Sequence, residues 1–223
     1  MLLISVPMAS GETPMLSNLA VYAVLAGMPI IVIAATSFLK ISVVLAILRS
    51  ALGAPGIPPT AVLTALSAVL TLFIMAPVGA EMVSAVEATD LLSDAETSPL
   101  GIEEAKALYA AASPPLLDFL EVNTPADESA FFSDLAGVPD DEAGLRVLLP
   151  AFATGELIEA FLMGFLIFIP FLVVDLVVSI VLLALGMHML SPTAVSLPLK
   201  LLLFVAVDGW HILVSGLVVN YGF

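Results

Sequence analysis

LLPAFATGELIEAFLMGFLIFIPFLVVDLVVSIVLLALGMHML, residues 148–190, is the hydrophobic block that decides the fold class of this chain. As a single α-helix, its stretch Leu157–Leu185 would be about 43 Å long at 1.5 Å per residue. The hydrocarbon core of a bilayer is only about 30 Å thick, so such a helix is too long to cross it upright. Four residues interrupt the block: Glu156, Glu159, Pro170 and Asp175.

The composition of the whole chain agrees with this block. Hydrophobic residues make up 61% of the 223 positions and charged residues only 11%. Soluble domains usually carry about 25% charged residues. The mean hydropathy of +1.18 therefore predicts an all-α, polytopic membrane protein and argues against an enzyme with a water-exposed active site.

The first hydrophobic segment, Leu16–Leu48, shows the same mismatch with a bilayer. As one helix it would be about 50 Å long, and it contains Pro29, Ser37 and Lys40. We expect it to tilt strongly, to break near Pro29, or to pack partly on protein rather than lipid.

Two shorter hydrophobic segments complete the set. Ala61–Val78 follows a Gly- and Pro-rich turn, and Pro77 is expected to mark its end. The stretch SPTAVSLP is expected to form the next turn, and Leu197–Val219 the last helix. Ser196 is a suitable N-cap for that helix, with Pro198 in its first turn. The four segments predict two hydrophobic hairpins.

An acidic insertion separates the two hairpins. Fifteen of the twenty acids lie between Glu81 and Glu142, where only Lys106 opposes them. We expect three parts: a hydrophobic hairpin over 1–80, the acidic insertion over 81–147 and a second hairpin over 148–223. Within the insertion, GIEEAKALYAAA favours a helix, PPLLDFLEV begins another short amphipathic piece, and PADESAFFSDLAGVPDDE is interpreted as a loop.

The few basic residues predict an orientation in the membrane. Arg49 lies in the turn after the first helix, and Lys200 follows the turn before the last one. Positive charges favour the cytoplasmic side. The two turns are therefore expected in the cytoplasm and the acidic insertion outside.

Several classes of function are disfavoured by the residue content. A net charge of −15 argues against nucleic acid, because binding phosphates requires Lys and Arg. The chain has no cysteine and two histidines, His188 and His211, which predicts no metal site and no cofactor. The motifs HExxH and G-x-S-x-G are absent, so no catalytic set is predicted.

Six charged residues lie in or beside apolar runs: Lys40, Glu156, Glu159, Asp175, Lys200 and Asp208. An ionised side chain in hydrocarbon costs several kcal/mol unless it has a partner or water. These groups could pair and hold helices or subunits in register, form a proton or ion relay, or line an aqueous pore. By helical spacing, Glu156 lies on one face with Glu159, and Asp208 with His211. Ala160 and Gly164 form a small-xxx-small pair that lets helices approach closely.

Longer motifs connect the chain to a known family. TSFLKISVVLAILRSALGAPGIPP with LTLFIMAPVG resembles the N-terminal half of the SctR/YscR/FliP family. PFLVVDLVVS, LGM-M-SP and K-LLFVAVDGW, within residues 148–217, resemble its C-terminal half. The resemblance covers nearly all of the hydrophobic chain.

The resemblance implies a core subunit of the type III protein export apparatus in the bacterial inner membrane. Copies of the chain, typically five, would join the S- and T-type small subunits in an export gate and work with needle and inner-rod components. The ring would lie partly on the periplasmic side, and unfolded substrate proteins would pass through it. A start without a basic n-region, and Ser191–Pro192 where flagellar members have two prolines, favour the injectisome branch.

The resemblance also assigns residues. Met187 and Met189 would project into the channel as a gasket, because methionine is flexible and polarizable. His188 departs from the family pattern. It either faces the pore, where it would make the seal sensitive to pH, or points away and bonds to a turn carbonyl. Glu156 and Lys200 fall where the family has a charge pair between neighbouring subunits.

The residues also allow a function of a different class. An ion- or proton-coupled secondary transporter would use Asp175, Asp208 and Glu156. Such transporters often contain inverted repeats, and the two halves of this chain differ in length and in the placement of charges.

Overall fold

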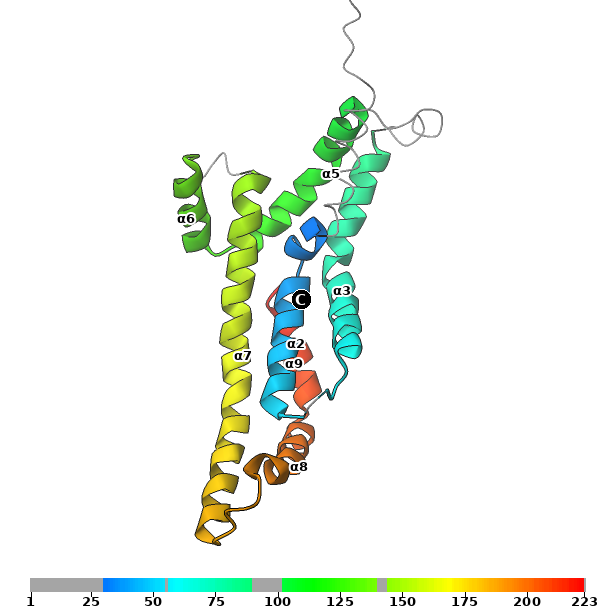
Figure 1. The fold of residues 1–223 in the computed structure, drawn as a ribbon. Helices are drawn as coiled ribbons and strands as arrows, with labels where there is room; N and C mark the ends of the chain where they lie inside the picture. The colour runs from blue at the N-terminus through cyan, green and yellow to red at the C-terminus, as the bar shows by residue number, and fades with distance from the viewer. Residues whose placement is uncertain (1–29, 55, 90–101, 140–143, 223) are drawn as a thin grey trace, which may run out of the picture.

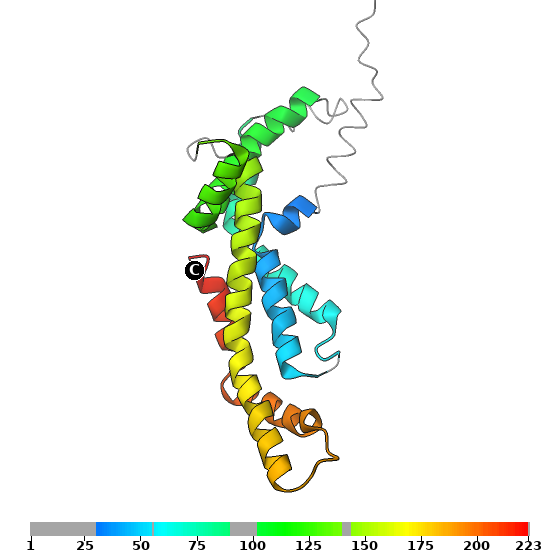
Figure 2. The ribbon, with the colours of Figure 1, turned by 60° about the vertical axis from the view of Figure 1, so that its left-hand side comes forward.

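The computed structural model describes residues 30–54, 56–89, 102–139 and 144–222 (Figure 1). Every regular element within these ranges is an α-helix, which confirms the all-α fold class. The long helix α7, Leu145–Ala184, runs along the molecule (Figures 1 and 2), and four of the other helices, α2, α5, α6 and α8, contact it.

The first hairpin consists of α2, Phe38–Leu52, and α3, Thr60–Glu87. A short helical stretch over 30–34 precedes α2 and ends in a turn at 35–37. The first hydrophobic segment is therefore broken at this turn, whereas Pro29 lies outside the described residues. Gly53, with a φ of 71°, ends α2 in the left-handed conformation that glycine adopts without strain.

The predicted end of the second helix at Pro77 is wrong. Helix α3 passes through Pro77 and continues to Glu87. A proline removes one backbone donor, and long apolar helices tolerate this loss when the freed carbonyl is satisfied locally. The absence of an N–H at one position therefore does not end a helix of 28 residues.

The acidic insertion is more helical than its composition predicts. Helix α5, Ile102–Asn123, runs through Pro114 and Pro115 without ending, so the predicted second piece belongs to the same helix. The predicted loop contains α6, Ala126–Ala136. Its helical signals are local: two acids in the first turn complement the helix dipole, and Gly137 ends the helix with a φ of 64°.

Helix α7 contains 40 residues, which corresponds to a length of about 60 Å. It contacts α2 along its middle, α5 and α6 near its N-terminal end, and α8 near its C-terminal end. In both views α2 and α7 descend side by side in the same direction (Figures 1 and 2). Pro150 and Pro170 both lie inside this helix.

The last hydrophobic segment is two helices rather than one. Helix α8, Pro192–Ala206, has Ser191 at its N-cap position, five residues before the expected N-cap at Ser196. Helix α9, Gly209–Val219, follows after a bend of 61°. Asp208 lies in the bend with a φ of 54°. The adjacent Gly209 has no room for a Cβ atom, which would lie 2.3 Å from the ring of Phe204.

Only part of this chain's hydrophobic surface is buried within the subunit. Helix α2 buries Ile41, Val44, Leu45 and Leu48 on one face, at the spacing of an amphipathic helix. From 161 to 181, α7 instead presents a series of large exposed side chains, among them Phe161, Phe165, Leu172 and Val181. Within the described residues, α3 and α7 are long and apolar enough to cross a membrane, and α8 with α9 makes a third span if the bent pair is one span.

The helices do not break at the expected borders of the three parts. Helix α3 passes through residue 80 and α7 passes through residue 148. The division into 1–80, 81–147 and 148–223 therefore stays a prediction.

Candidate functional site

Lys40 is the centre of a buried network at the start of α2. Its Nζ atom lies 2.8 Å from Oε1 of Glu156 and 2.7 Å from Oε2 of Glu159, both on α7. Lys40 and Glu156 are each 2% exposed, whereas Glu159 is 37% exposed. A buried charge without its partner is costly. We call Lys40, Glu156, Glu159, Asn220 and Tyr221 the Lys40 network.

The end of the chain after α9 completes the Lys40 network. Tyr221 donates a hydrogen bond from its hydroxyl to Oε2 of Glu156, and Asn220 donates to Oε2 of Glu159 at 2.7 Å. The ammonium group of Lys40 lies 4.4 Å from the ring centroid of Tyr221. Burial, together with the charge of Glu156, raises the pKa of Tyr221. The phenol therefore stays protonated and acts as a hydrogen-bond donor.

The ring of Tyr221 also connects this network to the acidic insertion. It stacks on Phe119 of α5 with ring centroids 6.0 Å apart and an angle of 16° between the planes. Phe119 in turn contacts Phe152 of α7, with centroids 5.8 Å apart. The Lys40 network thus joins α2, α5, α7 and the residues that follow α9.

A second network surrounds Lys200 near the other end of α2. Its Nζ atom lies 2.7 Å from Oδ2 of Asp175 and donates to the main-chain oxygen of Ala51 at 3.0 Å. Oδ1 of Asp175 accepts a hydrogen bond of 2.5 Å from Ser196. We call Asp175, Ser196, Lys200 and the Ala51 carbonyl the Lys200 network. A cation is favourable there, because the last carbonyls of a helix carry partial negative charge.

Together the two networks attach α2 to α7 at both ends. Lys40 in the first turn of α2 is paired with residues 156 and 159 of α7. The carbonyl of Ala51, in the last turn of α2, is linked through Lys200 to Asp175. These contacts support the interpretation that the charges hold helices in register.

The structure thus brings five of the six singled-out charges into intrachain pairs. Glu156 and Lys200, expected to pair between neighbouring subunits, each already have a partner of opposite charge within the chain. An additional contact across a subunit boundary stays a prediction. Asp208, the sixth charge, is exposed in the bend between α8 and α9.

The expectation that Asp208 and His211 lie on one face of a continuous helix is wrong. Asp208 stands at the N-cap position of α9, outside the helix, and its main-chain oxygen accepts the amide of His211 at 3.0 Å. The bend of 61° between α8 and α9, with the left-handed backbone at Asp208, therefore takes Asp208 out of the regular helical spacing.

The three carboxylates of the transporter hypothesis do not share one site. Glu156 and Asp175 are nineteen positions apart on the continuous helix α7, which corresponds to about 28 Å. Each is bonded to a different lysine, and Asp208 lies outside both networks. The geometry thus favours two separate structural pairs over one ion-binding centre. Within the described residues, no group of three or more His, Cys, Asp or Glu is placed to hold a metal ion.

The predicted gasket residues lie at the end of α7 that is far from α5 and α6 (Figures 1 and 2). The amide of Gly186 donates to the carbonyl of Leu183 at 3.0 Å, and that of Met187 to Leu182 at 2.9 Å. With Gly186 at a φ of 73°, these bonds form a Schellman motif, a fixed helix ending. We call residues 185–191 the methionine tip.

The side chains of the methionine tip are exposed, although to different degrees. Met189 is 99% exposed and Met187 44% exposed, and His188 is also exposed. The backbone of the tip is therefore held by hydrogen bonds, while its side chains lie on the surface of the subunit and can contact a molecule outside it.

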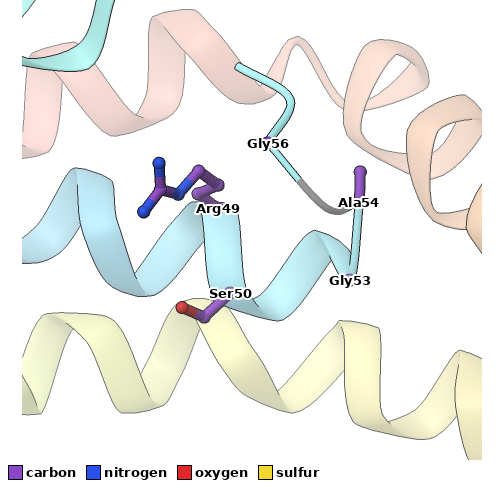
Figure 3. Close-up of a pocket in the computed structure, with 5 residues that line it drawn as sticks. All are labelled: Arg49, Ser50, Gly53, Ala54 and Gly56. Atoms are coloured by element: carbon purple, nitrogen blue, oxygen red, sulfur yellow. The ribbon is translucent and has the colours of Figure 1, made fainter. Parts of the chain in front are cut away.

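A separate pocket lies at the turn between α2 and α3. It has a volume of about 450 Å³ and is lined by Arg49, Ser50, Gly53, Ala54 and Gly56 (Figure 3). The side chains of Arg49 and Ser50 leave α2 in different directions (Figure 3). Arg49 donates to the hydroxyl of Thr60 at 2.6 Å. Among the described residues that line the pocket, the only charged one is Arg49, and its hydrogen bond to Thr60 already links α2 to α3. These lining residues contain no catalytic set.

Sequence reasoning missed Asn220, Tyr221 and the role of Ser196 in these networks. Ser196 was expected to cap a helix, and it instead donates to Asp175 from inside α8. Asn220 and Tyr221 are polar side chains directly after an apolar helix. Their position could have predicted this role, because buried carboxylates need hydrogen-bond donors and nearby polar side chains supply them.

Comparison with known proteins places this arrangement in a family. The model of the FliP family matches residues 21–217. The chain is 43% identical over 203 residues to "Yop proteins translocation protein R" of Yersinia pestis, covering 87% of this chain and 91% of that protein. It is 42% identical over 225 residues to "Flagellar biosynthetic protein FliP" of Cereibacter sphaeroides, covering 98% and 72%.

A third relative is the "Hypersensitivity response secretion protein HrcR" of Ralstonia nicotianae, with 40% identity over 216 residues, 92% of this chain and 97% of that protein. These relatives carry names from protein secretion and flagellar biosynthesis, and none of the three names is that of an enzyme. The chain therefore belongs to the FliP family, whose members are components of type III secretion and flagellar export systems.

Proposed function

We propose that the chain is a structural pore subunit of a type III export gate, through which unfolded proteins cross the bacterial inner membrane. The observation that carries this proposal is the methionine tip. Its backbone is fixed by a Schellman motif, while Met187 and Met189 are exposed. Flexible, polarizable side chains on a rigid support suit a seal that must reshape around a passing chain. A hydrophobic constriction can also exclude water and ions.

The exposed apolar surfaces support assembly into a ring. Large hydrophobic side chains are exposed on α7, α8 and α9, as well as on α3. Apolar surface of this extent requires lipid or other protein chains to cover it. We propose that further copies of this chain, five in the complete ring, cover part of it, together with S- and T-type small subunits. Needle and inner-rod components would adjoin the assembled gate.

We place the acidic insertion on the periplasmic side, and the end of α2 that carries Arg49, with the turn that follows it, on the cytoplasmic side. The supporting observation is the segregation of charge: fifteen acids lie between Glu81 and Glu142, and positive residues favour the cytoplasm. Among the two branches of the family, Ser191–Pro192 at the end of the methionine tip favours the injectisome branch.

The experiment that tests the pore role is ion conductance of the assembled gate in a planar bilayer. Met187→Ala and Met189→Ala should raise the conductance of the closed gate, because each removes sealing volume. Met82→Ala on α3 is the matched control and should leave conductance unchanged. Equal leakage in the wild type and both tip variants would contradict the gasket assignment.

His188 allows a second measurement on the same gate. If its side chain faces the pore, protonation adds charge to the constriction, and conductance should rise as the pH falls from 7 to 5. His188→Met should abolish that rise. A pH dependence that persists in His188→Met would assign the sensitivity to another group.

A further inference from the structure

The outward face of α6 is the surface on which we base a further inference. Counting along this helix, the exposed residues recur at a spacing of four: Asp127, Phe131 and Leu135 form one row, and Ala126, Ala130 and Asp134 form the next. Phe131 is 57% exposed and Leu135 is 66% exposed. These two large apolar side chains lie one helical turn apart, with Asp127 and Asp134 beside them. An apolar anchor with a charged rim is typical of a protein interface.

Helix α6 holds this face in a fixed position. Pro125, directly before the helix, packs so closely on α7 that a Cβ atom on Gly155 would lie 2.5 Å from its Cδ atom. Ser133, on the opposite side of α6, is 3% exposed. The rings of Phe131 and Phe132 meet edge to face with centroids 5.2 Å apart. One side of α6 is thus packed on the subunit, and this packing holds the exposed side in place.

The charge of the surroundings argues against a lipid surface as the occupant. Residues 81–142 contain fifteen acids against one lysine, a net charge of −14. Anionic headgroups would repel such a segment. Pro125, directly before α6, contacts α7 at Gly155, on the N-terminal side of the exposed apolar stretch 161–181. The outward face of α6 is therefore outside the part of α7 that matches a bilayer core.

A second copy of this chain is also a poor occupant. Two copies of the face would bring like charges together, which costs free energy. A different part of the chain would have to supply cations, and the chain has only five basic residues. Two of these, Lys40 and Lys200, are buried and paired. The other three, Arg49, Lys106 and Arg146, are single cations on a chain with a net charge of −15, so a basic protein complements this acidic face better than a second copy does.

We propose that the outward face of α6 docks a different, basic protein, whose apolar pocket receives Phe131 and Leu135 and whose Lys or Arg side chains pair with Asp127 and Asp134. The acids set the approach and the orientation, and the two apolar side chains supply the buried contact. This docking surface is independent of the pore role of the methionine tip.

Site-specific photocrosslinking of the full chain in its host cells tests the proposal. The photoreactive residue p-benzoylphenylalanine is placed at position 131 or 135, and at the exposed Tyr109 of α5 as the control. Positions 131 and 135 should yield adducts with one and the same protein, identified by mass spectrometry, with Lys and Arg in the crosslinked peptide. Position 109 should not capture it. Adducts only with another copy of this chain, only with lipid, with an acidic protein, or with nothing would overturn the proposal.

Charge reversal then separates specific docking from proximity. Asp127→Lys with Asp134→Lys should lower the adduct yield about tenfold, because it places like charges across the interface. Asp118→Lys, the same change at an exposed position of α5, should not. Reversing the cations in the partner's crosslinked peptide should restore the yield. Unaltered yield in the double variant, or no restoration, would contradict the charge pairing, and melting temperatures of the variants control for folding.

Discussion

The side chain of Ile47 occupies the space in which a Cβ atom on Gly164 would lie. Such an atom would be 2.4 Å from Cδ1 of Ile47 and 2.9 Å from its Cγ2. Helices α2 and α7 therefore touch here with the side chain of one against the backbone of the other. The small-xxx-small pair of Ala160 and Gly164, a signal for close helix approach, serves this contact inside the subunit.

Gly164→Ala should consequently destabilise the subunit by roughly 1–3 kcal/mol, the usual cost of forcing an extra carbon into a packed core. Thermal unfolding in detergent measures the effect. Gly79→Ala is the control, because a Cβ at that position meets nothing within 4 Å and alanine favours a helix. Adding Ile47→Ala to Gly164→Ala should recover part of the loss of melting temperature. An unchanged melting temperature in Gly164→Ala would refute the tight contact.

The pairing of Lys40 with Glu156 predicts a specific pattern of rescue. Lys40→Glu and Glu156→Lys should each cost roughly 3–5 kcal/mol, because each leaves a buried charge unpaired. The double swap should regain part of this, measured as the melting temperature of the detergent-extracted subunit. Arg146→Glu, at an exposed position of α7, is the control for a change of charge.

The same variants examine the proposed contact between subunits. If Glu156 also pairs with a neighbour's Lys200, the swap of Glu156→Lys with Lys200→Glu should restore ring assembly, followed by native mass spectrometry. Rescue by the Lys40 swap alone would show that the intrachain pair is the one that matters. Rescue by neither swap would count against direct pairing of either kind.

Tyr221→Phe should destabilise the subunit by about 1–3 kcal/mol, because Glu156 loses a hydrogen-bond donor in a buried setting. The ring remains and still stacks on Phe119, so the change isolates the hydroxyl group. Tyr109→Phe, at an exposed position, is the matched control and should not alter unfolding. Equal melting temperatures for the two variants would show that the hydroxyl contributes nothing.

The orientation of the acidic insertion can be tested directly, because the chain has no cysteine of its own. Val122→Cys lies at an exposed position of α5, whereas Ser133→Cys lies on the packed face of α6. An impermeant thiol reagent added to spheroplasts should label position 122 and spare position 133. Thr60→Cys, at the exposed start of α3, should react only after the inner membrane is opened. The reverse pattern would place the insertion in the cytoplasm.

Residue patterns were sufficient for the all-α class and for the charges that need partners. Both follow from strong constraints, because the apolar runs are too long for loops and charges in an apolar setting must find partners. The gasket role of Met187 and Met189 is implied by the family resemblance and stays a prediction. Residue patterns do not show which charge pairs with which. Lys40 lies more than a hundred positions from Glu156 in the chain, and only the packing of α2 on α7 brings the two together.

Prolines accounted for much of what sequence reasoning placed wrongly. The prediction that helices end or begin at Pro77, Pro114 and Pro115 is wrong, because all three lie inside helices. Proline weakens a helix locally by removing one donor, whereas neighbouring turns and tertiary packing contribute over the whole length. Within the described residues, the breaks inside the expected first and last hydrophobic helices lie at 35–37 and at Asp208. Neither contains proline or glycine, and at Asp208 the left-handed backbone accompanies the close packing of Gly209 on Phe204.

The uninterrupted course of α7 carries the methionine tip far from the Lys40 network. Because α2 and α7 are linked at Glu156, Glu159 and Asp175, the two helices rotate together as one body. The twenty-eight residues from Glu156 to Ala184 form an arm of about 42 Å. A rotation of the pair by roughly 10° about the level of Glu156 would displace the end of that arm by about 7 Å, which is more than one turn of helix.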